Sequence, residues 1–213
     1  MKLSSFIILL FLTTFHINYA QQTTYNQSLD SLKKNVQTLP NAELGSFIHR
    51  SLSEVVFPYW YGTIWDYNGY SNTPKNGVIA CGYFVSTTLK HFGFNLNRYD
   101  VAKKYSSSIV KTLCLDDYET YNRYDKFLYE MYSKKIGLYI IGLSNHVGFI
   151  EKTKHGELYF IHSNYMYPGV VCREKCSESM ALQASTVFWL GNFSNNLKVQ
   201  EYYLKKTYFT TIN

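Results

Sequence analysis

The spacing of apolar residues changes at Gly137, and this change constrains the fold more than any other feature of the sequence. Before Gly137 apolar residues recur every three or four positions, which predicts helices; after it they follow a strand-like alternation. The expected helices cover 41–56, 81–92, 97–113 and 116–135, with an aromatic, Gly- and Pro-rich loop over 57–77. The expected strands cover 138–143, 146–152, 157–163 and 185–193, with 201–212 as a closing strand. Helices followed by an antiparallel sheet indicate an α+β fold.

The first 20 residues have the layout of a secretory signal peptide. Lys2 precedes an apolar run from Phe6 to Phe15, and Ala20 ends the segment before a polar stretch. The apolar run is shorter than the roughly 20 residues that cross a bilayer. We therefore expect cleavage after Ala20, a single domain over 21–213, and an exported protein, periplasmic or secreted, without a stable membrane span.

Cys81 stands where the aromatic loop gives way to a helix, in the segment VIACGYF. A helix N-terminus stabilises a thiolate, and a nearby imidazolium does the same, so a cysteine at this position is a candidate nucleophile. The alternatives are a small core residue or one half of a disulfide. Gly93 is expected to end the helix, because glycine adopts the left-handed conformation that closes many helices.

Two histidines lie on neighbouring expected strands, His146 at the start of one and His162 at the end of the next. If the connecting loop is 153–155, the two histidines oppose each other across the strands. If the loop is 154–156, Asn164 opposes His146 and His162 lies diagonally. Either register gives His146 a polar partner, as a base that activates a cysteine requires.

The order of these features resembles the NlpC family of papain-like cell-wall cysteine peptidases. The resemblance spans 44–165. It rests on the segments PYWYG (58–62), CGYFVSTTL (81–89), NRYDVAKK (97–104) and GLYIIGLSNHVGFIEKTKHGELYFIHSNY (137–165). It identifies the chain as a divergent member of this family or of a neighbouring papain-like amidase group. It implies a papain-like fold, in which N-terminal helices pack on an antiparallel sheet and the nucleophile lies at a helix N-terminus.

The same resemblance implies an amide hydrolase with Cys81 as nucleophile, His146 as base and acid, and His162 as the third member, with Asn164 as the alternative. Tyr59 matches the family's loop tyrosine, whose hydroxyl lies near the sulfur and the oxyanion. The implied substrate is peptidoglycan or another peptide or amide. No cofactor or metal is implied.

Net charge and the other cysteines add weaker constraints. The formal charge is +6, without an Arg-rich helix or nucleic-acid motif, so we expect no nucleic-acid partner but attraction to anionic polymers. Cys172 and Cys176 suit a small-loop disulfide in an oxidising compartment. Zinc is disfavoured, because no further pair of Cys or His at ligand spacing accompanies them.

A rival interpretation is a non-catalytic secreted domain that binds peptide or glycan. The 21 tyrosines would supply its binding surface, and Cys81 would be inert or disulfide-bonded.

Overall fold

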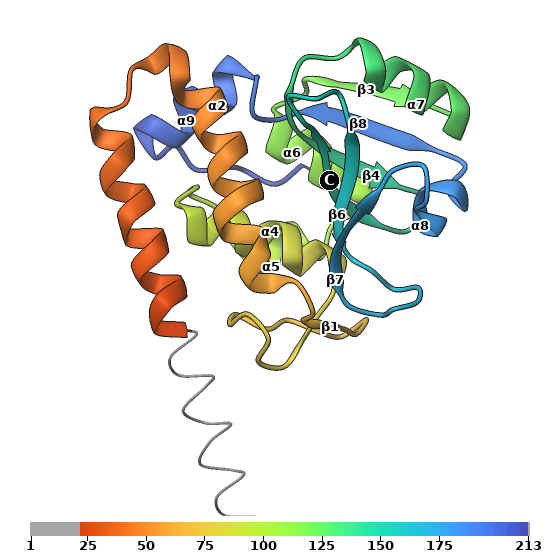
Figure 1. Cartoon of the computed structure of the whole chain (residues 1–213), viewed down its shortest axis with the longest axis horizontal. Helices are drawn as coiled ribbons and strands as arrows, with labels where there is room; N and C mark the ends of the chain where they lie inside the picture. The colour runs from red at the N-terminus through yellow and green to blue at the C-terminus, as the bar shows by residue number, and fades with distance from the viewer. Residues whose placement is uncertain (1–21, 213) are drawn as a thin grey trace, which may run out of the picture.

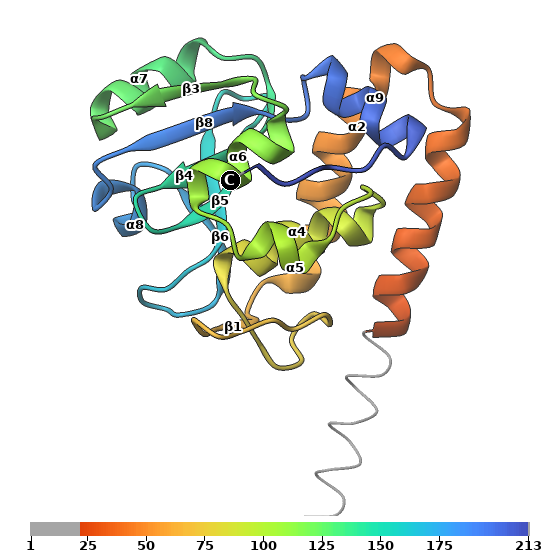
Figure 2. The ribbon, with the colours of Figure 1, turned by 180° about the vertical axis from the view of Figure 1, so that it is seen from behind.

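Helices cover both faces of a six-stranded antiparallel sheet in the computed structural model, which describes residues 22–212 (Figures 1 and 2). The expected signal peptide, 1–20, lies outside the described residues. The strand order is β3-β8-β4-β5-β6-β7. The strands of this main sheet are β3 (Tyr118–Tyr121), β4 (Gly137–Leu143), β5 (Val147–Lys152), β6 (Leu158–Ser163), β7 (Val171–Lys175) and β8 (Phe188–Asn192). A separate two-stranded parallel sheet pairs β1 (Ile64–Trp65) with β2 (Val78–Ile79). The predicted α+β fold with N-terminal helices is confirmed.

Most of the helices precede the sheet in the chain. A helix over 22–35 stands beside α2 at the side of the molecule (Figure 1). The others are α2 (Leu44–Arg50), a π-helical continuation (Ser51–Val56), α3 (Phe57–Trp60), α4 (Cys81–Phe92), α5 (Arg98–Ala102), α6 (Ser106–Cys114), α7 (Tyr124–Ser133), α8 (Met180–Gln183) and α9 (Leu197–Lys205). Among the described residues, no helix has both the length and the apolar character to cross a bilayer.

The alternation of side chains along the strands builds two hydrophobic cores, one on each face of the sheet. On one face, α4 and α6 pack on side chains that include Val147, Phe149 and Ile161. On the other face, α7 and α8 cover a second set that includes Ile150 and Phe160. Burial of each such side chain contributes about 1.5–3 kcal/mol, so the sheet is held by apolar contacts on both sides.

Glycines stand at both ends of helix α4 and have different roles there. A Cβ on Gly82 would lie 2.5 Å from the carbonyl oxygen of Ala102, so α5 crosses α4 in backbone contact there. Gly93 has φ +119° and ends the helix, with its N–H bonded to the Leu89 carbonyl, as the sequence predicted. The position of Cys81 therefore depends on the close approach at its neighbour Gly82.

A buried arginine holds the loop that precedes Cys81. Arg98 donates to the carbonyl oxygens of Tyr70 (2.7 Å) and Ser71 (3.1 Å) and to the Thr87 hydroxyl (2.7 Å). Its guanidinium also lies over the ring of Tyr99. These contacts satisfy a buried charge and tie the loop to α4.

Two helices expected from the sequence are interrupted. The segment 97–113 forms two helices, α5 and α6, because Tyr105 is extended (ψ 148°) between them. The segment 116–135 begins with a strand, β3, which pairs with β8, and only its second half is the helix α7. The turn at Leu115 and Asp116, both with positive φ, redirects the chain from α6 into β3.

Two further expectations were wrong, and one strand was missed. The segment 201–212 does not close the sheet: it starts within α9, whose N-cap Asn196 accepts hydrogen bonds from the N–H groups of Lys198 and Val199. The first residues of the expected loop, 57–60, form α3, with Pro58 in its first turn. Strand β7 was not expected at all, because its charged sequence resembles a loop.

Replacing Gly82 with alanine tests the fit of α4 against α5. Alanine normally favours a helix by about 1 kcal/mol over glycine. Here its Cβ would collide with the Ala102 carbonyl, so we expect urea denaturation to show a loss of about 1–3 kcal/mol in the free energy of unfolding. Lys90→Ala, on the exposed face of the same helix, should change it by less than about 0.5 kcal/mol. A stabilised Gly82→Ala variant would contradict this packing.

Candidate active site

Cys81 is the first residue of α4, and its thiol is free and partly accessible. The first N–H groups of a helix have no partner within the helix, and they create a positive potential at its start. No side chain caps this helix: the Ala80 position before it carries only a methyl group. The thiol is therefore carried by the residue at which the unpaired N–H groups of α4 begin.

The sulfur of Cys81 lies near a gap at the end of the ladder between the neighbouring strands β5 and β6. The ladder between β5 and β6 runs from Lys152–Leu158 to Phe149–Ile161, and in the described structure it stops short of Val147. The Val147 N–H is directed at the Cys81 sulfur instead of at β6. The β6 side of the gap is fixed by a further hydrogen bond, from the Ser163 hydroxyl to the Ile79 carbonyl (2.7 Å), just before Cys81.

His146 precedes β5 and belongs to a chain of three polar side chains. Its Nε2 lies 2.8 Å from Nδ1 of His162, and Nε2 of His162 lies 3.1 Å from Oε1 of Glu174 on β7. His146 is 2% exposed and His162 is fully buried, whereas Glu174 is reached by solvent. Among the described residues, the other ring nitrogen of His146, Nδ1, has no hydrogen bond, either to the Cys81 sulfur or to another atom.

The hairpin has the second of the two expected registers. Phe149 pairs with Ile161, and the loop is 154–156 with Gly156 at φ +81°. His162 therefore reaches His146 diagonally. No hydrogen bond joins Asn164 to His146 among the described residues: the Asn164 side-chain oxygen accepts the N–H of Met166 in the following loop. The structure thus brings together His146 and His162 and leaves the alternative Asn164 aside.

Tyr59 does not occupy the place expected for it. Its hydroxyl is hydrogen-bonded to Ser28 (3.0 Å), and its ring packs on Tyr25 of the N-terminal helix. The tyrosine beside the centre is Tyr165, whose ring centroid lies 5.0 Å from that of His146. Burial raises the pKa of Tyr165, and the charge of a Cys81 thiolate raises it further, which reflects its proximity to the sulfur.

The orientation of His162 is fixed by its neighbours on the sheet. The ring of Phe160 stacks on it, with centroids 3.9 Å apart and planes at 19°. A Cβ on Gly148 would lie 2.8 Å from Cβ of His162 and 2.7 Å from the Phe160 ring. Glycine at 148 therefore allows β5 to lie against this stacked pair.

Burial determines the resting protonation state of the centre. Burial raises the pKa of the Cys81 thiol, although the Val147 and Gly82 N–H groups act in the opposite direction. Burial also lowers the pKa of His146 well below its usual value, and His162 adds to this effect. The sequence led us to expect a thiolate stabilised by an imidazolium; these surroundings favour the neutral thiol and imidazole instead.

Glu174 was missed by the sequence analysis because β7 itself was missed. Burial raises the pKa of its carboxyl, but hydrogen bonds from His162 and Ser179 outweigh this effect and leave the pKa lowered. The carboxylate in turn opposes the burial that lowers the pKa of His162. The alternation of Cys172 and Glu174 in a polar segment was the only available sign of a strand.

The four cysteines, all within the described residues, are free thiols. The expected Cys172–Cys176 disulfide is absent because the strand β7 holds these residues apart. Four residues along a strand span about 13 Å, beyond the roughly 7 Å between Cα atoms that a disulfide tolerates. Cys172 lies 3.7 Å from Nε2 of His162, and burial together with Glu174 raises the pKa of its thiol to about 11.

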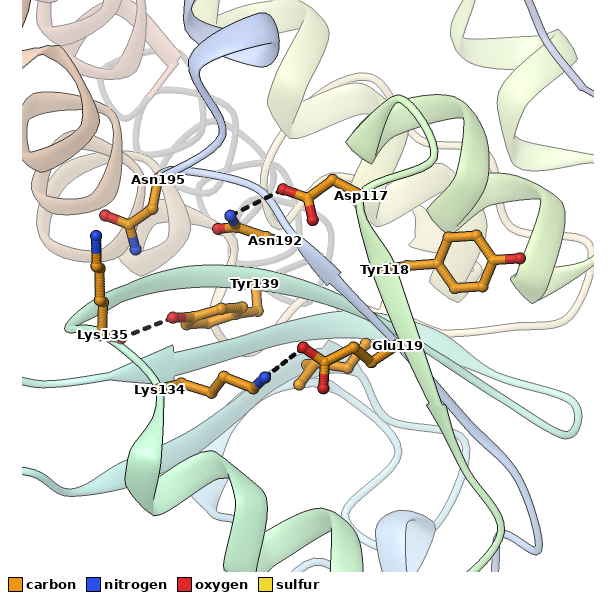
Figure 3. Close-up of a pocket in the computed structure, with 9 residues that line it drawn as sticks. Asp117, Tyr118, Glu119, Lys134, Lys135, Tyr139, Asn192 and Asn195 are labelled. Carbon is orange, nitrogen blue, oxygen red and sulfur yellow. Dashed lines mark hydrogen bonds and ion pairs between the residues drawn. The ribbon is translucent and has the colours of Figure 1, made fainter.

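Two cavities lie away from this centre. One, of about 200 Å³, lies between β3, β4 and β8, and its polar side chains pair with one another, including Lys134 with Glu119 and Asn192 with Asp117 (Figure 3). The other, of about 920 Å³, is lined by residues that include Arg173 and the buried hydroxyls of Ser53 and Tyr61. Neither is lined by Cys81, His146 or His162.

Comparisons of the chain with models of protein families, with curated proteins and with solved structures found no match.

The rate at which iodoacetamide modifies Cys81 tests its resting state. Because burial favours the thiol, we expect the rate to rise with pH around a midpoint above about 8.5, the value of an ordinary cysteine. Mass spectrometry of the peptide containing Cys81 gives the rate, and the fully buried Cys114 is the internal control, which should stay unmodified. Rapid modification below pH 7 that disappears in His146→Ala would instead show a thiolate–imidazolium pair.

Proposed function

We propose that the chain is a cysteine hydrolase that cleaves an amide bond, with Cys81 as nucleophile and His146 as general base and acid. The observation that supports this most is the buried sequence of hydrogen bonds from His146 through His162 to Glu174, together with a thiol at a helix N-terminus whose sulfur lies near the N–H of Val147, the residue after His146. A hydrogen-bonded partner that fixes the tautomer and orientation of a catalytic base is the central feature of such centres.

The first step transfers a proton and forms a thioester. His146 Nδ1 takes the thiol proton while the Cys81 sulfur attacks the carbonyl carbon. His146 is then an imidazolium, and its Nε2–H donates to Nδ1 of His162. The charge is stabilised by the chain of bonds to the Glu174 carboxylate. The imidazolium gives its proton to the leaving nitrogen, the C–N bond breaks, and the amine departs.

The second step restores the enzyme. His146 removes a proton from a water molecule that attacks the thioester, and the acid product leaves as the Cys81 thiol regains its proton. In both steps the carbonyl oxygen carries negative charge. The unpaired N–H groups at the start of α4 are the donors nearest to the sulfur that this oxygen would reach.

His162 and Glu174 act as positioning residues. In the active tautomer, His162 accepts from His146 at Nδ1 and donates from Nε2 to Glu174. A neutral relay of this kind avoids placing an uncompensated charge in the interior. Glu174, the only charged member, lies where solvent reaches it.

The proposed substrate is a peptide of bacterial peptidoglycan, met after export of the protein. This choice is supported by the resemblance to the NlpC family, the expected signal peptide and the charge of +6, which favours an anionic polymer. The fold proposed with it is a divergent papain-like fold. The arrangement of α4 against the antiparallel strands β5 and β6 is compatible with that proposal.

Hydrolysis of peptidoglycan fragments, followed by mass spectrometry of the products, tests the function. We expect Cys81→Ser and His146→Ala each to lower kcat/KM by at least about 10³-fold, because the reaction then loses its nucleophile or its base. His155→Ala, at the exposed hairpin tip, should leave it unchanged. Unaltered hydrolysis in Cys81→Ser would eliminate this mechanism. Binding of fragments without turnover would favour the non-catalytic domain.

The pH dependence of hydrolysis should reflect the two buried groups. The pKa of His146 lies well below its usual 6.5, so the base is already neutral at pH 7. Burial raises the pKa of Cys81 above that of an ordinary cysteine, so the thiol keeps its proton through mild alkali. We therefore expect kcat/KM to stay level between about pH 7 and 9. A bell-shaped profile with an acid limb at pH 6.5 or above would contradict the assignment.

A further inference from the structure

Three side chains with metal-binding atoms meet at the outer end of the relay. His162 Nε2 lies 3.1 Å from Glu174 Oε1 and 3.7 Å from Cys172 Sγ, and the three ligand atoms all lie within 4.8 Å of one another. The register explains the cluster. Cys172 on β7 directly opposes His162, and Glu174 opposes Phe160, so the three side chains leave the sheet on the same face.

Two of the three separations between ligand atoms are close to those around a tetrahedral cation, and the third, between the Cys172 sulfur and a Glu174 oxygen, is at most 4.8 Å. Zn²⁺ binds nitrogen, sulfur and oxygen at about 2.0–2.3 Å, which places tetrahedral ligand atoms about 3.3–3.6 Å apart. The observed separations from Nε2, 3.1 and 3.7 Å, lie just on either side of that range. Cys172 and Glu174 are half-buried, so a cation can enter from solvent and keep a water molecule as fourth ligand.

We propose that His162, Cys172 and Glu174 form an inhibitory site for a divalent cation of the Zn²⁺ type. Imidazole, thiolate and carboxylate together favour zinc and similar ions over magnesium and calcium, which prefer oxygen ligands. On binding, Cys172 releases its thiol proton to solvent. The thiolate and the Glu174 carboxylate then balance the two positive charges of the ion.

Inhibition follows from the two nitrogens of His162. Catalysis, as proposed above, needs a proton on Nε2 of His162 so that Nδ1 accepts from His146. A cation on Nε2 moves that proton to Nδ1, and Nδ1 must then donate to Nε2 of His146. His146 consequently carries its own proton on Nδ1, the atom that should receive the proton of Cys81. The effect on activity rests on the proposed function, whereas the site rests on the three ligands alone.

Cobalt binding to the chelator-treated mature protein tests the site directly. Co²⁺ bound to a thiolate gives a near-ultraviolet charge-transfer band, which we expect to saturate at one equivalent and to disappear when Zn²⁺ displaces the cobalt. Cys172→Ser should abolish the band. Cys81→Ser and Cys176→Ser, which leave the three ligands in place, should retain it. Absence of the band, or its loss only in Cys81→Ser, would overturn the proposal.

A second variant provides an independent test of the site if Cys172→Ser does not fold. Glu174→Gln removes one charged ligand and keeps the shape of the side chain, so we expect Co²⁺ affinity to fall by at least about 10-fold. Thermal unfolding of each variant without metal gives the control for folding. Unchanged affinity in a folded Glu174→Gln protein would also overturn the site.

The tautomer of His146 shows whether a cation bound at the site has the proposed effect on the relay. Nitrogen NMR should show the proton of His146 on Nε2 without metal and on Nδ1 with one equivalent of Zn²⁺. Hydrolysis by the parent protein should be lost over the same titration, whereas Cys172→Ser should keep its activity at the same Zn²⁺ concentration. If the tautomer changes but no substrate is hydrolysed even without metal, the proposed function fails and the site stands. If cobalt binds but the tautomer does not change, the inhibitory role is wrong.

Discussion

The centre depends on how the start of α4 meets the end of the β5–β6 ladder, where the N–H of Val147 lies near the sulfur of Cys81 and opposes the rise of its pKa. That N–H is available because the ladder of β5 with β6 ends at Phe149. The start of α4 fits into this gap, where α5 approaches closely enough to require glycine at 82. The backbone that carries the thiol is thus held at Gly82 by the close approach of Ala102.

Burial determines which members of the relay are neutral and which are ionised. In a medium of low polarity an isolated ion is costly, so His146 and His162 are favoured as neutral rings joined by a hydrogen bond. The carboxylate of Glu174 is the one ionised member, and it lies at the end that solvent reaches. The proposed chemistry therefore creates charge only transiently, when Cys81 gives up its proton, and the carboxylate stabilises the imidazolium formed at that moment.

Local sequence signals predicted much of this centre, and long-range pairing accounts for what they missed. The helix start at Cys81, its end at Gly93 and the contact of His146 with His162 follow from short patterns of glycine, helix period and strand alternation. Glu174 was missed because β7 is an edge strand, and one of its faces carries charge instead of an apolar row. Tyr59 was misplaced because its partner, Ser28, lies in a helix whose docking no local pattern reveals. Strand β3 pairs with β8, which lies far along the chain and which no local pattern around β3 reveals.

The edge strand β7 links the two proposals physically. It pairs with β6 alone among the strands of the main sheet, and its inward face carries Cys172 and Glu174 against His162. The carboxylate that completes the relay is therefore also the natural ligand of a cation, and the two uses compete for Nε2 of His162. An imidazole has only two nitrogens, and one of them is committed to His146. Any ligand that occupies the other must alter the proton on the first, so a relay built on two histidines is open to control from its outer end.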